Sequence, residues 1–187
     1  MKIKRRYLGL LLGVVLFATG CAQIPKEAGF NEVKDMVGQR VDYRIQWSQD
    51  EEADREVEKA IQELLQSELM PETAVQIALL NNPNLQAAYE DLGITQADVV
   101  EAGMLENPVL FGQARFPNRS EESANYEFGI AQNFLNILMQ PARKKLSAIR
   151  FEQVKLQVAD EVIQMVAQVQ KSYFKVLGAR QIRDLRN

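Results

Sequence analysis

The chain has 187 residues, no histidine and a single cysteine, Cys21. Without histidine it lacks the commonest general base and the commonest metal ligand, so we expect neither an enzyme nor a cofactor or metal site. Residues 21–187 carry 18 Lys and Arg against 25 Asp and Glu, a net charge of −7, because residues 1–20 hold four basic and no acidic side chains. This acidic balance argues against nucleic acid as a partner.

The first 21 residues have the pattern of a bacterial export signal. Basic side chains at positions 2, 4, 5 and 6 precede an apolar run of 11 residues over 7–17. A membrane-spanning helix needs about 20 residues, so residues 1–20 are predicted to be a signal peptide. The sequence Ala18-Thr19-Gly20-Cys21 resembles the lipobox of bacterial lipoproteins, which implies cleavage before Cys21 and lipid attachment to it. The alternative is an ordinary secretory signal with an unmodified cysteine.

Two short regions follow the signal. Residues 21–30 contain a proline and a glycine and are predicted to be a tether, and residues 31–70 form an N-terminal periplasmic segment. Positions 31–49 allow no firm assignment, although part of them alternates as a strand does: Val41, Tyr43, Ile45 and Trp47. Ser48 is expected to cap a helix over 50–69, whose acidic first turn suits the helix dipole.

Two further helices are predicted over 72–81 and 83–104. Asn82 is a good N-cap for the second helix, and Pro83 suits its first position, where the missing N–H is no loss. Asn107 precedes a proline and is therefore disfavoured in the α region, so the helix ends before it. The side of this helix expected to face inward carries Leu85, Ala88, Tyr89, Leu92, Gln96, Val99 and Val100.

A β-hairpin is predicted from two strands, 109–116 and 125–135. In the second strand one face carries Tyr126, Phe128, Ile130 and Phe134, and the other carries Glu127, Gly129, Ala131 and Asn133. The lengths are close to the 9–11 residues of a tilted transmembrane strand. A soluble hairpin would show the same alternation, so the pattern alone leaves both interpretations open.

The last predicted element is a helix over 141–187, about 70 Å long at 1.5 Å per residue. Its first apolar seam holds Phe151, Val154, Val158, Val162, Met165, Val169 and Val176. The second seam holds Ile149, Leu156, Ile163, Val166, Phe174 and Leu177. A helix with two seams must bury both, which favours a position between neighbours in a closed ring of helices. The alternative is a long helix in an ordinary bundle.

Residues 71–89 (PETAVQIALLNNPNLQAAY) resemble the opening motif of TolC-like outer-membrane efflux proteins. The match is carried by Ala74, Ala78, Leu79, Asn82, Pro83, Leu85 and Ala88. The order of helix pair, Asn-Pro, hairpin and very long helix is also that of the family, and the resemblance covers about residues 69–187. It implies a mainly α fold with a transmembrane β-hairpin, as one repeat of a trimeric α-barrel/β-barrel outer-membrane channel.

The resemblance implies a passive exit duct of a tripartite system that carries drugs or metal ions out of the cell. The duct would be a homotrimer, lipid-anchored in the outer membrane of a Gram-negative bacterium, that extends into the periplasm and contacts a periplasmic adaptor and an inner-membrane pump. Phe128 would then face outer-membrane lipid and Glu127 the lumen. Family members carry two repeats, so 71–187 is predicted to be a first repeat, truncated at its C-terminus, rather than a half-length protein that assembles as a hexamer. The alternative function is a lipid-anchored periplasmic coiled-coil scaffold or adaptor, which leaves the aromatic hairpin unexplained.

Overall fold

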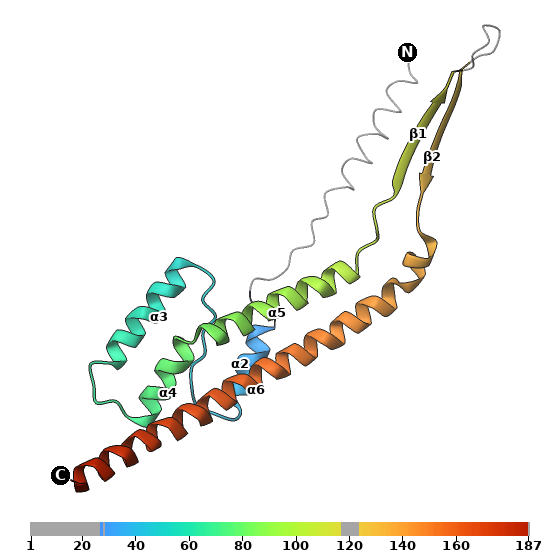
Figure 1. The fold of residues 1–187 in the computed structure, drawn as a ribbon. Helices are drawn as coiled ribbons and strands as arrows, with labels where there is room; N and C mark the ends of the chain where they lie inside the picture. Colours follow the sequence, from blue (N-terminus) through green and yellow to red (C-terminus); the bar gives the residue numbers. More distant parts are fainter. Residues whose placement is uncertain (1–26, 28, 117–123, 187) are drawn as a thin grey trace.

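The computed structural model describes residues 27, 29–116 and 124–186. The elements are α2 (Phe30–Gly38), α3 (Glu51–Leu64), α4 (Pro71–Leu80), α5 (Pro83–Ala102), β1 (Val109–Arg115), β2 (Asn125–Ala131) and α6 (Phe134–Arg186). Figure 1 shows an elongated molecule in which α5 lies along α6, α3 and α4 lie towards the end of α6 farthest from the strands, and the hairpin projects from the other end. The described chain is therefore mainly helical with one small antiparallel sheet, which confirms the coarse fold class.

One apolar core lies where α2, α4 and α5 meet the middle of α6. Tyr89 and Leu92 of α5 are fully buried against Val162 of α6, as the inward side predicted for α5 requires. The first predicted seam of α6 faces this core from Phe151 to Val169, whereas its last member, Val176, is 60% exposed. The buried apolar residues are Phe30, Val33, Val37, Ile45, Trp47, Val75, Leu79, Leu80, Leu85, Ala88, Tyr89, Leu92, Phe151, Val158, Ala159, Val162 and Val166.

The segment over 41–47 is extended but pairs with no other strand in the described structure, so its alternation does not mark a sheet. The side chains of two glutamines form the hydrogen bonds with this backbone that a neighbouring strand would form in a sheet. Gln76 accepts from the Arg44 N–H at 3.0 Å and donates to the Arg44 carbonyl at 2.8 Å. Gln86 accepts from the Ser48 N–H and donates to the carbonyl of Gln46, both at 2.9 Å. Backbone groups outside a helix or sheet also form hydrogen bonds, and here side chains of α4 and α5 are the partners.

Helix α3, over 51–64, is shorter at both ends than the helix predicted over 50–69. Asp50, not Ser48, is its N-cap, because the Asp50 carboxylate accepts from the Ala53 N–H at 3.0 Å. The Ser48 hydroxyl instead hydrogen-bonds to the Asp54 carboxylate. The helix ends at Leu64, where the hydroxyl of Ser67 donates to the carbonyl of Leu64 and satisfies one of the free groups of the last turn.

The helix pair lies within two residues of the predicted bounds. Asn82 caps α5 as predicted, because its side chain accepts from the N–H groups of Asn84 at 2.8 Å and Leu85 at 3.4 Å. The first helix runs over 71–80 rather than 72–81, with Pro71 inside its first turn. The second ends at Ala102 rather than residue 104, because Gly103 is a poor helix former and its carbonyl accepts from the side chain of Gln140.

The boundary between hairpin and long helix differs most from the prediction. The second strand ends at Ala131, not residue 135, and α6 begins at Phe134, not residue 141, so Pro141 lies inside the helix and Phe134 is not on a strand face. Asn133 starts the helix, since its side chain accepts from the Asn136 N–H at 3.3 Å. Proline usually breaks a helix. Here the guanidinium of Arg143 donates to Asn136, at 3.0 Å to Oδ1 and 3.2 Å to the carbonyl, and supports the turn before Pro141.

Removing the hydroxyl of Tyr89 is expected to stabilise the protein. The hydroxyl oxygen is buried and has no hydrogen-bond partner among the described residues. Burial raises the pKa of Tyr89 above its ordinary value near 10, and the charge of Glu161 raises it further. Tyr89→Phe should therefore gain about 1 kcal/mol in urea unfolding at pH 7.

The same substitution should also change the stability at high pH. An unfolded tyrosine loses its proton near pH 10 while Tyr89 of the folded chain keeps it, so native stability should fall above about pH 10. Tyr89→Phe should remove that part of the loss. A lower stability of Tyr89→Phe at pH 7 would contradict the prediction.

Candidate functional site

The hairpin formed by β1 and β2 is the most unusual surface of the molecule. Its strands pair antiparallel over seven residue pairs, from Val109 with Ala131 to Arg115 with Asn125. None of its side chains is buried, and its apolar ones are open to solvent on the single chain: Phe128 is 82% exposed and Ile130 73%. An isolated two-stranded hairpin is only marginally stable in water, and its strand edges have unpaired N–H and C=O groups. We therefore expect another molecule or a lipid phase to cover this surface.

The register divides the hairpin into an apolar face and a mixed face. Residues that pair across the strands share a face, so the apolar face holds Leu110, Gly112, Ala114, Tyr126, Phe128 and Ile130. Phe116 extends this face, with its ring edge-on to Tyr126 at 6.5 Å between centroids. The predicted placement of Glu127 and Phe128 on opposite faces is confirmed for these residues.

The mixed face carries polar side chains at the end nearest the turn. Gln113 pairs directly with Glu127, and Arg115 lies 3.7 Å from the Glu127 carboxylate and 3.3 Å from the Gln113 side-chain oxygen. The ion pair is well exposed, so it adds little to stability. It keeps the charged groups together on one side of the sheet. The sequence does not indicate the role of Arg115, because only the register shows which residues of β1 lie beside Glu127.

Two glycines accommodate aromatic rings within the sheet. The ring of Phe128 lies over Gly112, where a Cβ would come within 3.2 Å of it. On the other face the ring of Phe111 covers Gly129 so closely that a Cβ would lie 2.2 Å from its Cζ. An aromatic ring over a glycine of the neighbouring strand is a known way to stabilise a ladder and fix its register. The two pairs therefore hold the faces in place.

Two hydrogen bonds below the hairpin join the chain that enters it to the chain that leaves it. The side chain of Gln132 donates to the Glu106 carbonyl at 3.0 Å, and that of Gln140 donates to the carbonyl of Gly103. Exposed apolar side chains surround these contacts and continue the apolar surface of the hairpin: Met104, Leu105, Val109, Phe134, Leu135, Leu138 and Met139. We call this group the apolar collar.

A second exposed apolar surface runs along α6. We call it the outer stripe: Leu146, Ile149, Leu156, Phe174, Ile182 and Leu185, all at least half exposed. At 3.6 residues per turn these side chains share one side of the helix, opposite the core residues Phe151, Val158 and Val162. The stripe contains Ile149, Leu156 and Phe174 of the predicted second seam, while Val166 of that seam is buried in the core. A helix that is apolar on opposite sides is suited to neighbours on both.

Other predicted features lie outside this surface. Cys21, the predicted lipid-attachment residue, and residues 117–123 of the hairpin turn lie outside the described residues. No group of three Cys, Asp or Glu side chains in the described structure could hold a metal ion. Of the helices described, none combines the length and the hydropathy needed to cross a membrane. Scans of protein-family models, curated proteins and solved structures return no match for the chain.

Proposed function

We propose that the protein is a passive outer-membrane exit duct of a tripartite efflux system, a TolC-like channel for drugs or metal ions. The observation that carries the proposal is the hairpin, which is exposed on both faces. One face is wholly apolar, and the other is mixed, with Gln113, Arg115 and Glu127 at the end nearest the turn. Strands of an outer-membrane barrel alternate in this way, with apolar residues towards lipid and polar residues towards the lumen. Phe128 then faces lipid, and Arg115 and Glu127 face the pore.

The size of the hairpin supports this proposal. Seven paired residues span about 24 Å at 3.4 Å per residue, close to the ~25 Å apolar band of outer-membrane barrels. Strands in such barrels are tilted, so the apolar band must continue beyond the ladder. Phe116 at one end and the apolar collar at the other provide that continuation.

Closure of the barrel requires several copies. One hairpin in lipid would leave its edge N–H and C=O groups without partners, which costs several kcal/mol for each group. A homotrimer in which hairpins pair edge to edge removes those edges. The outer stripe of α6 gives each copy a helical surface for its neighbours, so the barrel continues as a wall of helices into the periplasm. An adaptor and an inner-membrane pump would complete the system and supply the energy.

The position of Gly29 is consistent with an anchor at Cys21 in the same membrane. Gly29 has a positive φ of 84° and lies against Phe151, where a Cβ would come within 2.6 Å of Cζ. From Phe151 to Phe134 the helix rises about 26 Å. The eight residues from Cys21 to Gly29 reach at most about 28 Å when fully extended. Lipid on Cys21 can therefore reach the level of the apolar collar, where the membrane surface would lie.

Replacement of the cysteine should remove the lipid anchor. Cys21→Ser keeps the size and polarity of the side chain but lacks the sulfur that carries the diacylglycerol. We expect complete loss of labelling by radioactive palmitate and accumulation of unprocessed or mis-sorted precursor, with Ser67→Cys added as a control that cannot restore labelling. Unchanged labelling of Cys21→Ser would contradict the assignment.

The alternative, a lipid-anchored periplasmic scaffold, differs in what holds it to the membrane. We would export the chain with an ordinary cleavable signal peptide, so that no lipid is attached, and extract membranes with high salt and then with detergent. A duct should stay in the membrane until detergent is added, and it should give discrete conductance steps in planar bilayers. Release by salt alone, without conductance, would favour the scaffold and contradict the duct.

A further inference from the structure

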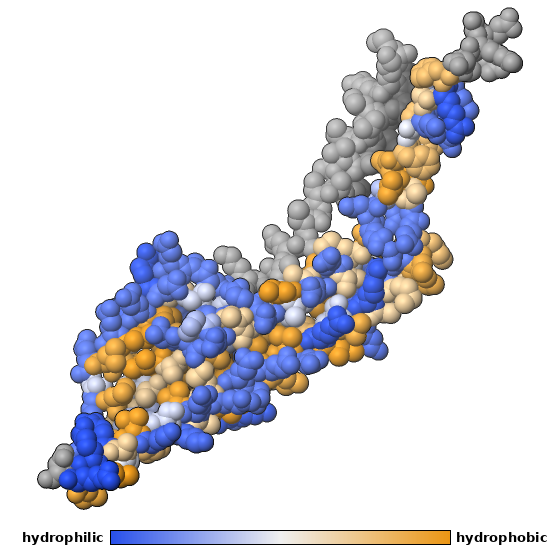
Figure 2. All heavy atoms as spheres, viewed as in Figure 1, coloured by the Kyte–Doolittle hydropathy of each residue, from blue (hydrophilic) through white to orange (hydrophobic). Residues whose placement is uncertain are grey.

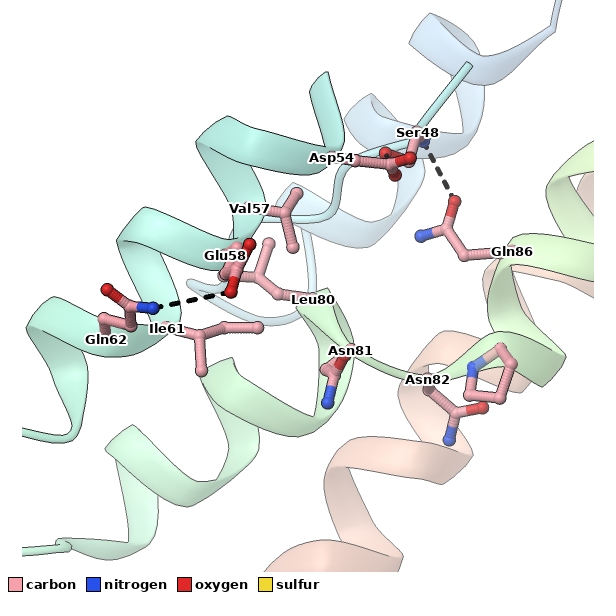
Figure 3. A pocket seen from close by; sticks show the side chains of 11 residues that line it. Ser48, Asp54, Val57, Glu58, Ile61, Gln62, Leu80, Asn81, Asn82 and Gln86 are labelled. Carbon is pink, nitrogen blue, oxygen red and sulfur yellow. Dashed lines mark hydrogen bonds between the residues drawn. The ribbon is translucent and has the colours of Figure 1, made fainter. Parts of the chain in front are cut away.

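Helix α3 is held loosely and has a groove beside it. No residue of α3 is buried in the described structure. Its apolar side, with Val57 and Ile61, packs on α4 and stays partly exposed. A groove of 790 Å³ lies between α3 and the junction of α4 with α5. Figure 3 shows Val57 and Ile61 of α3 directed towards Leu80 of α4 across this groove. An apolar band is visible between the two helices in Figure 2.

The rim of the groove is acidic. Asp54 and Glu58 line it from α3, beside the amides of Asn81 and Gln86. Over its whole length α3 carries six acidic and two basic residues, a net charge of −4. Both basic residues, Arg55 and Lys59, lie outside the groove lining. The groove therefore suits an apolar row of side chains flanked by cations.

The end of α6 carries such a row. Residues 171–186, which we call the basic tail, hold five basic residues and one acidic residue, a net charge of +4. The outer stripe continues through the tail as Phe174, Ile182 and Leu185, all exposed. At 3.6 residues per turn, Lys171 lies beside Phe174 on one side of the helix, and Lys175 lies beside Lys171. The charge of the tail is equal and opposite to that of α3.

We infer that the basic tail of one copy docks on the α3–α4 groove of a second copy. The tail cannot fill the groove of its own chain, because α6 is one continuous helix to Arg186. The groove and the tail are different surfaces, so repeated docking is head-to-tail and can close into a ring. The Tyr173 hydroxyl donates to the carbonyl of Leu69 at 2.8 Å, so the tail starts at the level of the α3–α4 connection. Asn82, which lines the groove, lies 3.5 Å from the Met165 sulfur of α6. In a ring whose axis follows α6, the first turns of the tail, with Lys171 and Phe174, are therefore the part that lies nearest the height of a neighbour's groove.

This inference rests on the self-association in the proposed function but not on entry of the hairpin into lipid. Two differently tagged full chains, one with Glu58→Cys and one with Lys171→Cys, would be expressed together and oxidised. We expect a disulfide-linked product that carries both tags. Lys59→Cys in place of Glu58→Cys is the matched control, since it is the next residue on α3 but faces away from the groove, and it should give at least tenfold less product.

Charge reversal provides a second test that needs no cysteine. Glu58→Lys or Lys171→Glu alone should weaken self-association about fivefold in sedimentation at low salt, and the two together in one chain should restore it. Both positions are exposed, so far-UV circular dichroism should not change. If oligomers form but give no cross-link, and neither charge reversal weakens them, the inference is wrong and the proposed duct function is unaffected. A chain that stays monomeric and gives no cross-link would overturn the inference and the self-association of the duct together.

Discussion

Phe128→Arg is expected to abolish assembly of the protein in the outer membrane. Phe128 is 82% exposed on the apolar face of the hairpin and lies over Gly112 in the middle of the ladder. Arginine near the middle of the lipid-facing surface costs about 2–4 kcal/mol, and a trimer carries that cost in every copy. We expect detergent-stable oligomers in membranes of the wild type and none in those of Phe128→Arg.

The control for this substitution places the same residue on the other face. Gln113→Arg puts a cation directly opposite Glu127, on the mixed face and one residue along the chain from Gly112. It should leave assembly unchanged, because its side chain faces water and an acidic partner.

A spin label separates a lipid-facing surface from one that is buried in protein. At position 128 the label should be more accessible to oxygen dissolved in lipid than to a water-soluble relaxer, and at position 113 the order should reverse. Equal accessibility of the two sites, or loss of assembly in Gln113→Arg, would contradict the proposed faces.

Trp47→Ala should cause the largest loss of stability of any substitution in the extended segment. Trp47 is 9% exposed, its ring lies 5.8 Å from that of Phe30, and its Nε1–H donates to the Glu90 carboxylate at 2.9 Å. Loss of a buried tryptophan side chain costs about 3–5 kcal/mol. Since small domains have about 5–15 kcal/mol in total, urea unfolding followed by far-UV circular dichroism should show a marked shift.

Trp47→Phe is the matched variant, because it keeps a buried ring and removes the hydrogen bond to Glu90. It should cost about 1–2 kcal/mol, clearly less than the alanine substitution. A loss below 1 kcal/mol in Trp47→Ala would mean that the segment over 41–47 is not part of the folded core.

Features that depend on neighbours in the chain could be predicted from the sequence. The break at Asn82 was predictable because an N-cap and a proline at the first helical position act within one turn, and the structure has both. The opposite faces of Glu127 and Phe128 follow from the two-residue period of a strand. The core-facing side of α6 follows from the helical period of Phe151, Val158 and Val162.

Features that depend on distant partners required the tertiary structure. The stretch over 41–47 has the alternation of a strand, but its backbone partners are Gln76 and Gln86, which lie more than 30 residues away in the chain. Pro141 indicated a helix start, yet α6 runs through it, and the side chain of Gln140 just before it donates to the carbonyl of Gly103, which lies 37 residues away in the chain. Arg115 reaches Glu127 only because the ladder sets the register. In each case a polar group is satisfied by a side chain or strand that folding brings close, so the outcome depends on packing and not on propensity.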